Sequence, residues 1–202
     1  MQKGTKISCV VPFHWMKEWQ FYLTRCLESI ERQTYKDYEV ILVKHSDMPT
    51  TSNRAMQAAT GELIKVLYMD DFLAHDNALK EIAEHFPVDA QWLVTGCLHQ
   101  TRTGRPERPH YPQYTDDIST GNNCIGSPSV LTLRNDGKLL FDEKLSWLLD
   151  CDLYKRLHDT YGPPVLLSDL NVVIGQGDQQ MTHILTDERK LSEHRYLNEK
   201  HV

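Results

Sequence analysis

The sequence lacks the features that most quickly assign a chain to a class. Its apolar runs are short, far from the roughly 20 residues of a membrane-spanning helix. Its five cysteines are an odd number and form no Cys-x-x-Cys pair, which predicts reduced thiols rather than a disulfide framework. Positive charge is scarce, with 22 Lys and Arg against 28 Asp and Glu. This balance argues against a protein built mainly to bind nucleic acid.

The first residues, MQKGTKISCVVPFHW, also lack the pattern of a signal peptide. Their apolar run is short and meets Pro12 and His14 where a small-residue cleavage site would be needed. Together with the reduced thiols, this predicts a cytoplasmic protein without a transmembrane segment. The 202 residues, of which 40% are hydrophobic and 25% charged, predict a single domain (1–202) with a sizeable core.

The sequence does contain an alternation of strand and helix patterns. Short apolar and β-branched runs predict strands at 6–12, 38–44, 62–69 and 91–98. Apolar spacing and end signals predict helices at 19–33, 49–61 and 74–86. Such alternation over the first hundred residues is typical of an α/β fold with a Rossmann-like, mainly parallel sheet flanked by helices on both faces.

Polar residues follow three of these strands, at the place where parallel sheets bind ligands. The three segments are 12–14 (Pro-Phe-His), 44–46 (Lys-His-Ser) and the pair Asp70-Asp71. Two adjacent carboxylates repel each other and resist desolvation. They fit either a solvated loop with a helix cap or a site for a cation, and their position at a strand end favours the cation.

The second half of the chain is less regular. Residues 99–114 contain three prolines and three arginines, Arg102, Arg105 and Arg108. They predict an extended surface loop that is either simply solvated or in contact with an anionic acceptor. Further elements are expected as strands at 127–134 and 164–175, the latter with a break near residue 169, and as helices at 148–162 and 187–202.

These features together resemble the family-2 glycosyltransferases of GT-A fold. The segment RCLESIERQTYKDYEVILV (25–43) is similar to that family's first helix and second strand, and GELIKVLYMDDF (61–72) to the strand before its metal motif. Asn53, Ala59 and Gly61 have the family's spacing. IGSPSVLTLR, FDEKLSWLLDCDLYKRL and the following YG resemble its acceptor-side half, so the resemblance covers roughly residues 6–180.

The resemblance implies a nucleotide-sugar-binding half (1–100), an acceptor-side half (101–186) and a charged C-terminal tail (187–202). Asp70 matches the last Asp of the family's Asp-x-Asp motif, which holds a divalent cation, Mn²⁺ or Mg²⁺, on the donor diphosphate. Asp71 matches the acidic residue that often follows this motif. Asp150 matches the Asp that supplies the general base.

The same resemblance gives further residues a role at the site. Those expected to contact the donor, besides Asp70, are Pro12, Phe13, His14, His45, Asn53 and Tyr68. Asp152 is a second candidate for the base and an acceptor contact, while Arg102, Arg105 and Arg108 are expected to bind the acceptor. His183 either completes the metal site, as a histidine does in some enzymes of this fold, or is a surface histidine.

Three departures from the family pattern affect the choice of donor. Tyr68 replaces the first Asp of the metal motif, Lys44-His45 replaces the Asp-Asp usual after the second strand, and Leu149 replaces the Glu before Asp150. The fold and the metal-dependent transfer are compatible with these changes. The uridine nucleotide usual in the family does not follow from them.

The chemistry of glycosyl transfer explains why these residue types are needed. The reaction breaks a bond to a diphosphate through an oxocarbenium-like transition state, and a hard cation held by one or two carboxylates stabilises the leaving group. A further carboxylate can take the proton of the acceptor hydroxyl. The sequence therefore predicts a metal-dependent glycosyltransferase acting on a saccharide or small-molecule acceptor, with inversion implied by the resemblance.

Three alternatives stay open at this point. The acceptor could be a hydroxymethylated base in phage DNA, which the arginine loop permits and the acidic balance opposes. The chain could be a non-catalytic nucleotide-sugar-binding relative, which the departures would signal and an intact Asp150 opposes. A nucleotidyltransferase is the third, but such enzymes usually have a glycine-rich loop after the first strand, and PFHWMKEW contains no glycine.

Overall fold

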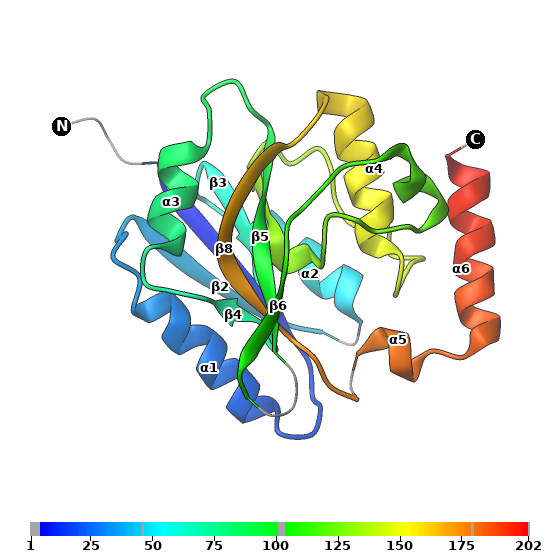
Figure 1. The fold of residues 1–202 in the computed structure, drawn as a ribbon, viewed down its shortest axis with the longest axis horizontal. Helices are drawn as coiled ribbons and strands as arrows, with labels where there is room; N and C mark the ends of the chain where they lie inside the picture. Colours follow the sequence, from blue (N-terminus) through cyan, green and yellow to red (C-terminus); the bar gives the residue numbers. More distant parts are fainter. Residues whose placement is uncertain (1–4, 46, 101–103, 179, 202) are drawn as a thin grey trace.

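One eight-stranded mixed sheet with helices on both faces organises the computed structural model, which describes residues 5–45, 47–100, 104–178 and 180–201 (Figure 1). The first half contains β1 (Ile7–Phe13), α1 (Trp19–Glu31), β2 (Tyr38–Lys44), α2 (Met48–Gln57), β3 (Leu63–Val66), β4 (Phe72–Leu73), α3 (Ala78–His85) and β5 (Trp92–Gln100). The second half contains β6 (Pro106–His110), η1 (Asp116–Thr120), η2 (Pro128–Val130), β7 (Leu131–Arg134), α4 (Leu149–Tyr161), β8 (Val165–Gly175), α5 (Met181–Ile184) and α6 (Asp187–Lys200).

The strand order places the ends of five strands at one edge of the sheet. The order is β2-β1-β3-β7-β5-β8-β4, with β6 paired to β5. β1 is parallel to β2 and β3, and β5 is parallel to β8, while β7 runs antiparallel between β3 and β5. Strands β1, β2, β3, β5 and β8 therefore share one direction. The α/β class with a helix-flanked sheet is confirmed, and β7 is the strand that makes the centre of the sheet mixed.

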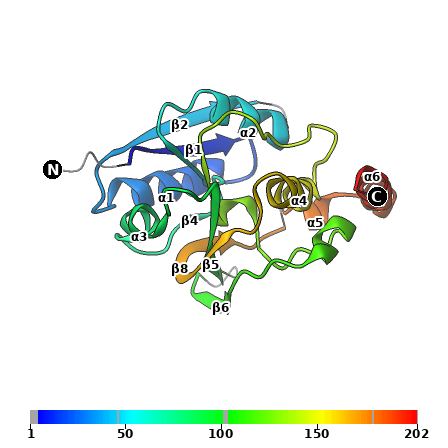
Figure 2. The ribbon, with the colours of Figure 1, turned by 90° about the horizontal axis from the view of Figure 1, so that it is seen from above.

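Helices cover both faces of this sheet, as the alternating sequence pattern requires. Figure 2 shows α1 and α3 on one side and α2 and α4 on the other. The buried positions Leu23, Cys26 and Ile30 of α1 have the spacing of three and four that predicted the helix. The end of α1 is fixed to the start of α3, because Gln33 Oε1 accepts a hydrogen bond from the Leu79 amide at 2.9 Å. Within the described parts of the chain, every helix is too short or too polar to cross a membrane.

The sheet corrects the expectation of an extended loop at residues 99–114. Strand β5 continues to Gln100, and Pro106–His110 forms β6, which pairs antiparallel with it. Arg105 and Arg108 therefore lie on or beside a hairpin, while Arg102 lies outside the described residues. The run of prolines hid this strand, because proline cannot donate a ladder hydrogen bond and is confined to edge strands.

Strand β8 is continuous, where the sequence suggested a break near Asp169. Its pairing with β5 skips from Leu167 to Leu170, so Ser168 and Asp169 form a bulge. A Cβ on the facing Gly96 would lie 3.0 Å from the Ser168 carbonyl oxygen. Glycine at position 96 thus lets the bulged strand pack closely and continue to Gly175 at the site edge.

Candidate active site

The acidic pair Asp70-Asp71 lies just beyond β3, at the edge where the parallel strands end. Its turn is held by three backbone contacts. The Tyr68 amide donates to Ser129 Oγ at 2.9 Å, the Asp71 amide donates to the Tyr68 carbonyl at 2.9 Å, and Arg25 Nη2 donates to the Asp70 carbonyl at 2.7 Å. The turn therefore presents the two carboxylates in a fixed position.

The two carboxylates have different surroundings. Asp71 is only 3% exposed; its Oδ1 accepts a hydrogen bond from the Gly175 amide at 2.8 Å, and its Oδ2 lies 3.4 Å from Ser127 Oγ. Asp70 is half-buried, and the hydrogen bond to its main chain leaves its carboxylate to the cavity described below. Asp71 thus joins the end of β8 to the turn, while Asp70 is the more accessible of the pair.

The pair is short of positive charge. Burial, with the neighbouring charge of Asp70, raises the pKa of Asp71 to about 8. Burial also raises the pKa of Asp70, although His14 and Arg25 oppose the shift. The Nδ1 atom of His14 is buried without a hydrogen-bond partner in the described structure. Carboxylate oxygens that resist their own charge, beside an unpartnered nitrogen, fit a divalent cation.

A cavity of 410 Å³, here called the first cavity, brings the main candidates together. His14, Tyr68, Asp70, Asp71 and Asp150 all line it. The first four come from the ends of β1 and β3, and Asp150 comes from the first turn of α4. The sequence placed these residues at one site, and the structure brings them to one cavity at the carboxyl edge of the sheet.

Asp150 is oriented by its neighbours. Its Oδ2 accepts a hydrogen bond from Asn123 Nδ2 at 2.8 Å, and its Oδ1 accepts one from the Cys151 amide at 2.8 Å. Burial raises the pKa of Asp150 to about 6, and these hydrogen bonds moderate the shift. A carboxylate with this pKa is largely ionised at neutral pH and still basic enough to take a proton.

Tyr68 stands where the family has a carboxylate. Its hydroxyl lies 3.5 Å from Ser52 Oγ, and burial raises the pKa of the phenol. The side chain is therefore neutral, and it adds a hydroxyl to the first cavity instead of a third negative charge. This placement is compatible with a donor contact.

Four of the residues expected to contact the donor lie outside the first cavity. Pro12 lies within β1, opposite Val43 of β2, and the ring of Phe13 stacks on Trp19 with centroids 6.2 Å apart. His45 is half-buried and its Nδ1 lies 3.4 Å from an oxygen of Asp47.

Asn53 is the fourth of these residues, and it has a clear packing role. It is buried, and its amide pairs with the backbone of Phe141, donating at 3.0 Å and accepting at 2.8 Å. This double hydrogen bond joins α2 to the segment before α4. The family spacing of Asn53 thus identifies a residue that organises the fold beside the site.

Asp152 and His183 also lie away from the first cavity. Asp152 is fully buried and paired with Arg156 Nη2 at 2.7 Å, Lys200 Nζ at 2.7 Å and His201 Nε2 at 3.0 Å. It therefore attaches α6 to α4. His183 is exposed on α5, whose other residues do line the cavity.

Two residues that sequence reasoning missed hold the acceptor side of the cavity. Asn123 orients Asp150 and also accepts hydrogen bonds from the Ile125 and Gly126 amides at 2.9 and 3.0 Å. Glu193 of α6 is 2% exposed and accepts hydrogen bonds from three consecutive amides, residues 146–148, at 2.8 to 3.1 Å. Local sequence gives no signal for either contact, because both partners are distant in the chain.

Comparison with known proteins was made at the levels of sequence and fold. The sequence matches no protein family model and no curated protein. The fold matches S. aureus TarS 1–349 in complex with UDP-GlcNAc, with a TM-score of 0.67 and 16% identity over 97% of this chain and 66% of that one. It also matches the mannosyltransferase PcManGT from Pyrobaculum calidifontis in complex with GDP-Man and Mn²⁺, with a TM-score of 0.63 and 11% identity over 90% of this chain and 59% of that one.

The chain has the fold of these proteins. At such low identity the similarity establishes the fold alone. The chain spans less than two thirds of the length of each, and 37% of the length of S. aureus TarS in a further match with a TM-score of 0.63. The fold expected from the sequence is thereby confirmed, and two of the matching structures hold nucleotide-sugars.

Proposed function

We propose that the protein is a glycosyltransferase that moves a sugar from a nucleotide-sugar donor to a hydroxyl of a saccharide or small-molecule acceptor. The main support is the meeting of Asp70, Asp71 and Asp150 in the first cavity, at the carboxyl edge of the sheet. Two structures of the same fold hold UDP-GlcNAc and GDP-Man, which supports this class of donor and leaves the base open.

Asp70 and Asp71 would hold a divalent cation, Mn²⁺ or Mg²⁺. When bound, the cation supplies Lewis-acid stabilisation of the charge that develops on the diphosphate. Among the described residues no group of three His, Cys, Asp or Glu side chains could hold an ion alone. This fits a site in which phosphate oxygens and waters provide the remaining ligands, as Mg²⁺ sites with one or two carboxylates do.

Asp150 would take the proton of the acceptor hydroxyl. Its raised pKa of about 6 leaves it ionised at neutral pH, and Asn123 fixes the orientation of the carboxylate. Direct attack by a hydroxyl activated in this way inverts the anomeric carbon. The presence of a placed base in the same cavity as the acidic pair favours an enzyme over a non-catalytic binding protein.

The proposal is tested by the thermal stability of the protein in the presence of nucleotide-sugars. The unfolding temperature is measured with UDP-, GDP-, ADP- and dTDP-sugars, each with and without Mn²⁺. A ligand that binds only the folded state stabilises it in proportion to the logarithm of its excess over Kd. At least one donor should therefore raise the unfolding temperature, and Mn²⁺ should increase that rise.

Two carboxylate variants localise the effect. Asp70→Ala should keep the fold and lose the Mn²⁺-dependent part of the rise. Asp89→Ala, which removes an exposed carboxylate just before β5 at the opposite edge, should keep it. A Mn²⁺-dependent rise that persists in Asp70→Ala would show that the cation binds elsewhere.

A further inference from the structure

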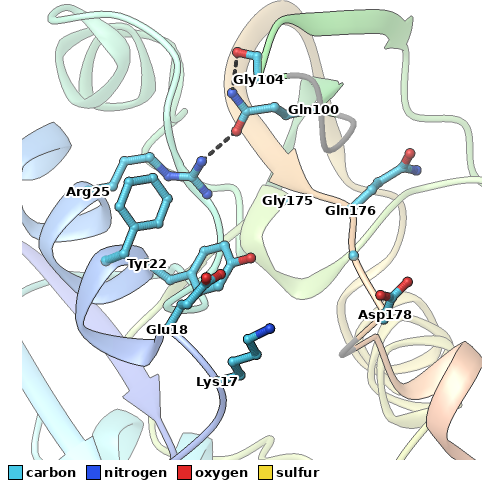
Figure 3. Close-up of a pocket in the computed structure, with 11 residues that line it drawn as sticks. Lys17, Glu18, Tyr22, Arg25, Gln100, Gly104, Gly175, Gln176 and Asp178 are labelled. Carbon is cyan, nitrogen blue, oxygen red and sulfur yellow. Dashed lines mark hydrogen bonds between the residues drawn. The ribbon is translucent and has the colours of Figure 1, made fainter.

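A second cavity, of 650 Å³, lies beside the first and takes no part in the chemistry described above. Residues at the start of α1 form one wall, and the ends of β5 and β8 form the other (Figure 3). Gly175 lines both cavities, and a Cβ on it would clash with the carbonyl oxygen of Asp70. The second cavity therefore lies directly against the backbone of the acidic pair.

Arg25 forms the part of the wall shared with the acidic pair. Its Nη2 donates to the Asp70 carbonyl at 2.7 Å, and its Nη1 donates to Gln100 Oε1 at 2.5 Å. The guanidinium lies 4.4 Å from the centroid of the Phe72 ring. Because these contacts engage the cation, Arg25 acts as a rigid wall of the second cavity rather than as a free positive charge.

The backbone around the second cavity is held in an unfavourable conformation at two places. Glu18 (φ 60°) and Arg108 (φ 53°) are the non-glycine residues with left-handed backbone in the described part of the chain. Glu18 lines the cavity, and Arg108 Nη2 donates at 2.7 Å to Oε1 of Gln176, which also lines it. Such strain concentrates at ligand sites, where surrounding contacts maintain it.

Aromatic rings supply an apolar surface to this cavity. Phe21 is 62% exposed, and Tyr22 lies beside it, with the Arg25 guanidinium 5.6 Å from each ring centroid. The C–H face of a pyranose ring packs well on an exposed aromatic ring, and the hydroxyls at its rim both donate and accept hydrogen bonds. Glu18 and Gln176, on facing walls in Figure 3, offer an acceptor and an amide to such hydroxyls.

The charges that line the second cavity balance. Lys17 and Arg25 are positive, and Glu18 and Asp178 are negative. A phosphorylated or otherwise strongly anionic ligand would meet repulsion from the two carboxylates. The combination of aromatic surface, mixed hydrogen-bonding groups and no net charge suits an uncharged polyhydroxylated ligand.

We propose that the second cavity binds a neutral saccharide, namely the part of the acceptor that does not react. This inference rests on the proposed sugar transfer, and it names both the acceptor class and its place. Binding energy from a remote part of a substrate can be used to orient the reacting part. A site that shares Gly175 with the first cavity is close enough to serve this purpose.

The test measures binding of neutral trisaccharides directly, without requiring transfer. Maltotriose, cellotriose, mannotriose and N,N′,N″-triacetylchitotriose are titrated by saturation-transfer NMR and calorimetry, with a sulfated trisaccharide for comparison. At least one neutral probe should bind the wild type more tightly than the sulfated one. Phe21→Ala and Glu18→Gln should each weaken that binding at least about tenfold, whereas Tyr111→Ala, which removes an exposed ring elsewhere, should leave it unchanged.

Each outcome of this test decides something. No binding of any neutral probe, or binding that Phe21→Ala leaves intact, would overturn the second site. Tighter binding of the sulfated probe would overturn the assignment of a neutral ligand. The nucleotide-sugar titration is run on the same variants and should be unaffected. Nucleotide binding without saccharide binding would leave the proposed function standing, and saccharide binding without nucleotide binding would leave only the second site.

Discussion

The carboxylate of Asp71 accepts a hydrogen bond from the backbone amide of Gly175 at 2.8 Å, although 104 positions separate the two residues in the chain. The bond joins the turn after β3 to the end of β8. Gly175 also lies between the two cavities, so this contact fixes the wall that both share. Asp71 therefore has a structural task as well as its proposed part in cation binding.

Two substitutions separate these tasks of Asp71. Asp71→Ala leaves the buried Gly175 amide without a partner and should destabilise the protein by about 1–3 kcal/mol. Asp71→Asn keeps an acceptor oxygen and should retain most of the stability, yet it should weaken Mn²⁺-dependent donor binding. Urea unfolding and donor titration measure the two effects. Equal stability losses in both variants would show that the hydrogen bond is not the stabilising feature.

The raised pKa of Asp150 gives the protein a predictable pH dependence of stability. Burial raises this pKa from 3.8 to about 6, so the folded state favours the protonated carboxyl. The contribution is fully present below about pH 4 and is lost as pH rises through about 6. Asp150→Asn avoids this loss and should gain about 1–2 kcal/mol relative to wild type between about pH 4 and pH 7. Urea unfolding at these two pH values, showing no relative gain, would contradict the assigned pKa shift.

Glu193 should be essential for the placement of the α4 N-terminus. Its buried carboxylate accepts three backbone hydrogen bonds and one from Arg189 Nε at 3.1 Å. Glu193→Ala should cost about 3 kcal/mol or more, because several buried donors lose a charged partner. Glu193→Gln should recover part of this, and Glu199→Ala, at an exposed position of the same helix, should cost little. A mild effect of Glu193→Ala in chemical unfolding would show that α6 is dispensable there.

The arginines of residues 99–114 allow a test of the nucleic-acid alternative. The guanidinium of Arg108 is hydrogen-bonded to Gln176, at the edge of the second cavity. We expect the wild type to show no salt-dependent binding of duplex DNA even at low ionic strength. If it does bind, the triple variant of Arg102, Arg105 and Arg108 to Gln should flatten the salt dependence by about one unit of slope for each phosphate that the variant no longer binds. That result would favour a DNA acceptor.

Periodicity and strand-end chemistry predicted the first half of the fold well. The apolar runs of β1, β2, β3 and β5 and the spacing in α1 depend on burial, which local sequence records. The same logic placed Asp70-Asp71 at the ligand edge. The resemblance to a family added Asp150, which lies in a helix far from that edge in sequence and lines the same cavity.

Contacts between distant segments could not be predicted in this way. Nothing near Glu193 in sequence shows that it binds amides 45 to 47 positions earlier. Asp152 has the composition of an active-site carboxylate, but the helical twist turns it toward α6, where it is fully buried. The second cavity likewise depends on three segments that meet only when the sheet forms.

The most direct test of the account is release of nucleoside diphosphate from the donor that binds best. Wild type should release it in the presence of Mn²⁺ or Mg²⁺ and a neutral saccharide acceptor. Asp150→Asn should bind the donor normally and lose about 10²–10⁴-fold in kcat, because the base acts only in the chemical step. Near-wild-type turnover in Asp150→Asn, or release by wild type that needs no cation, would contradict the proposed mechanism.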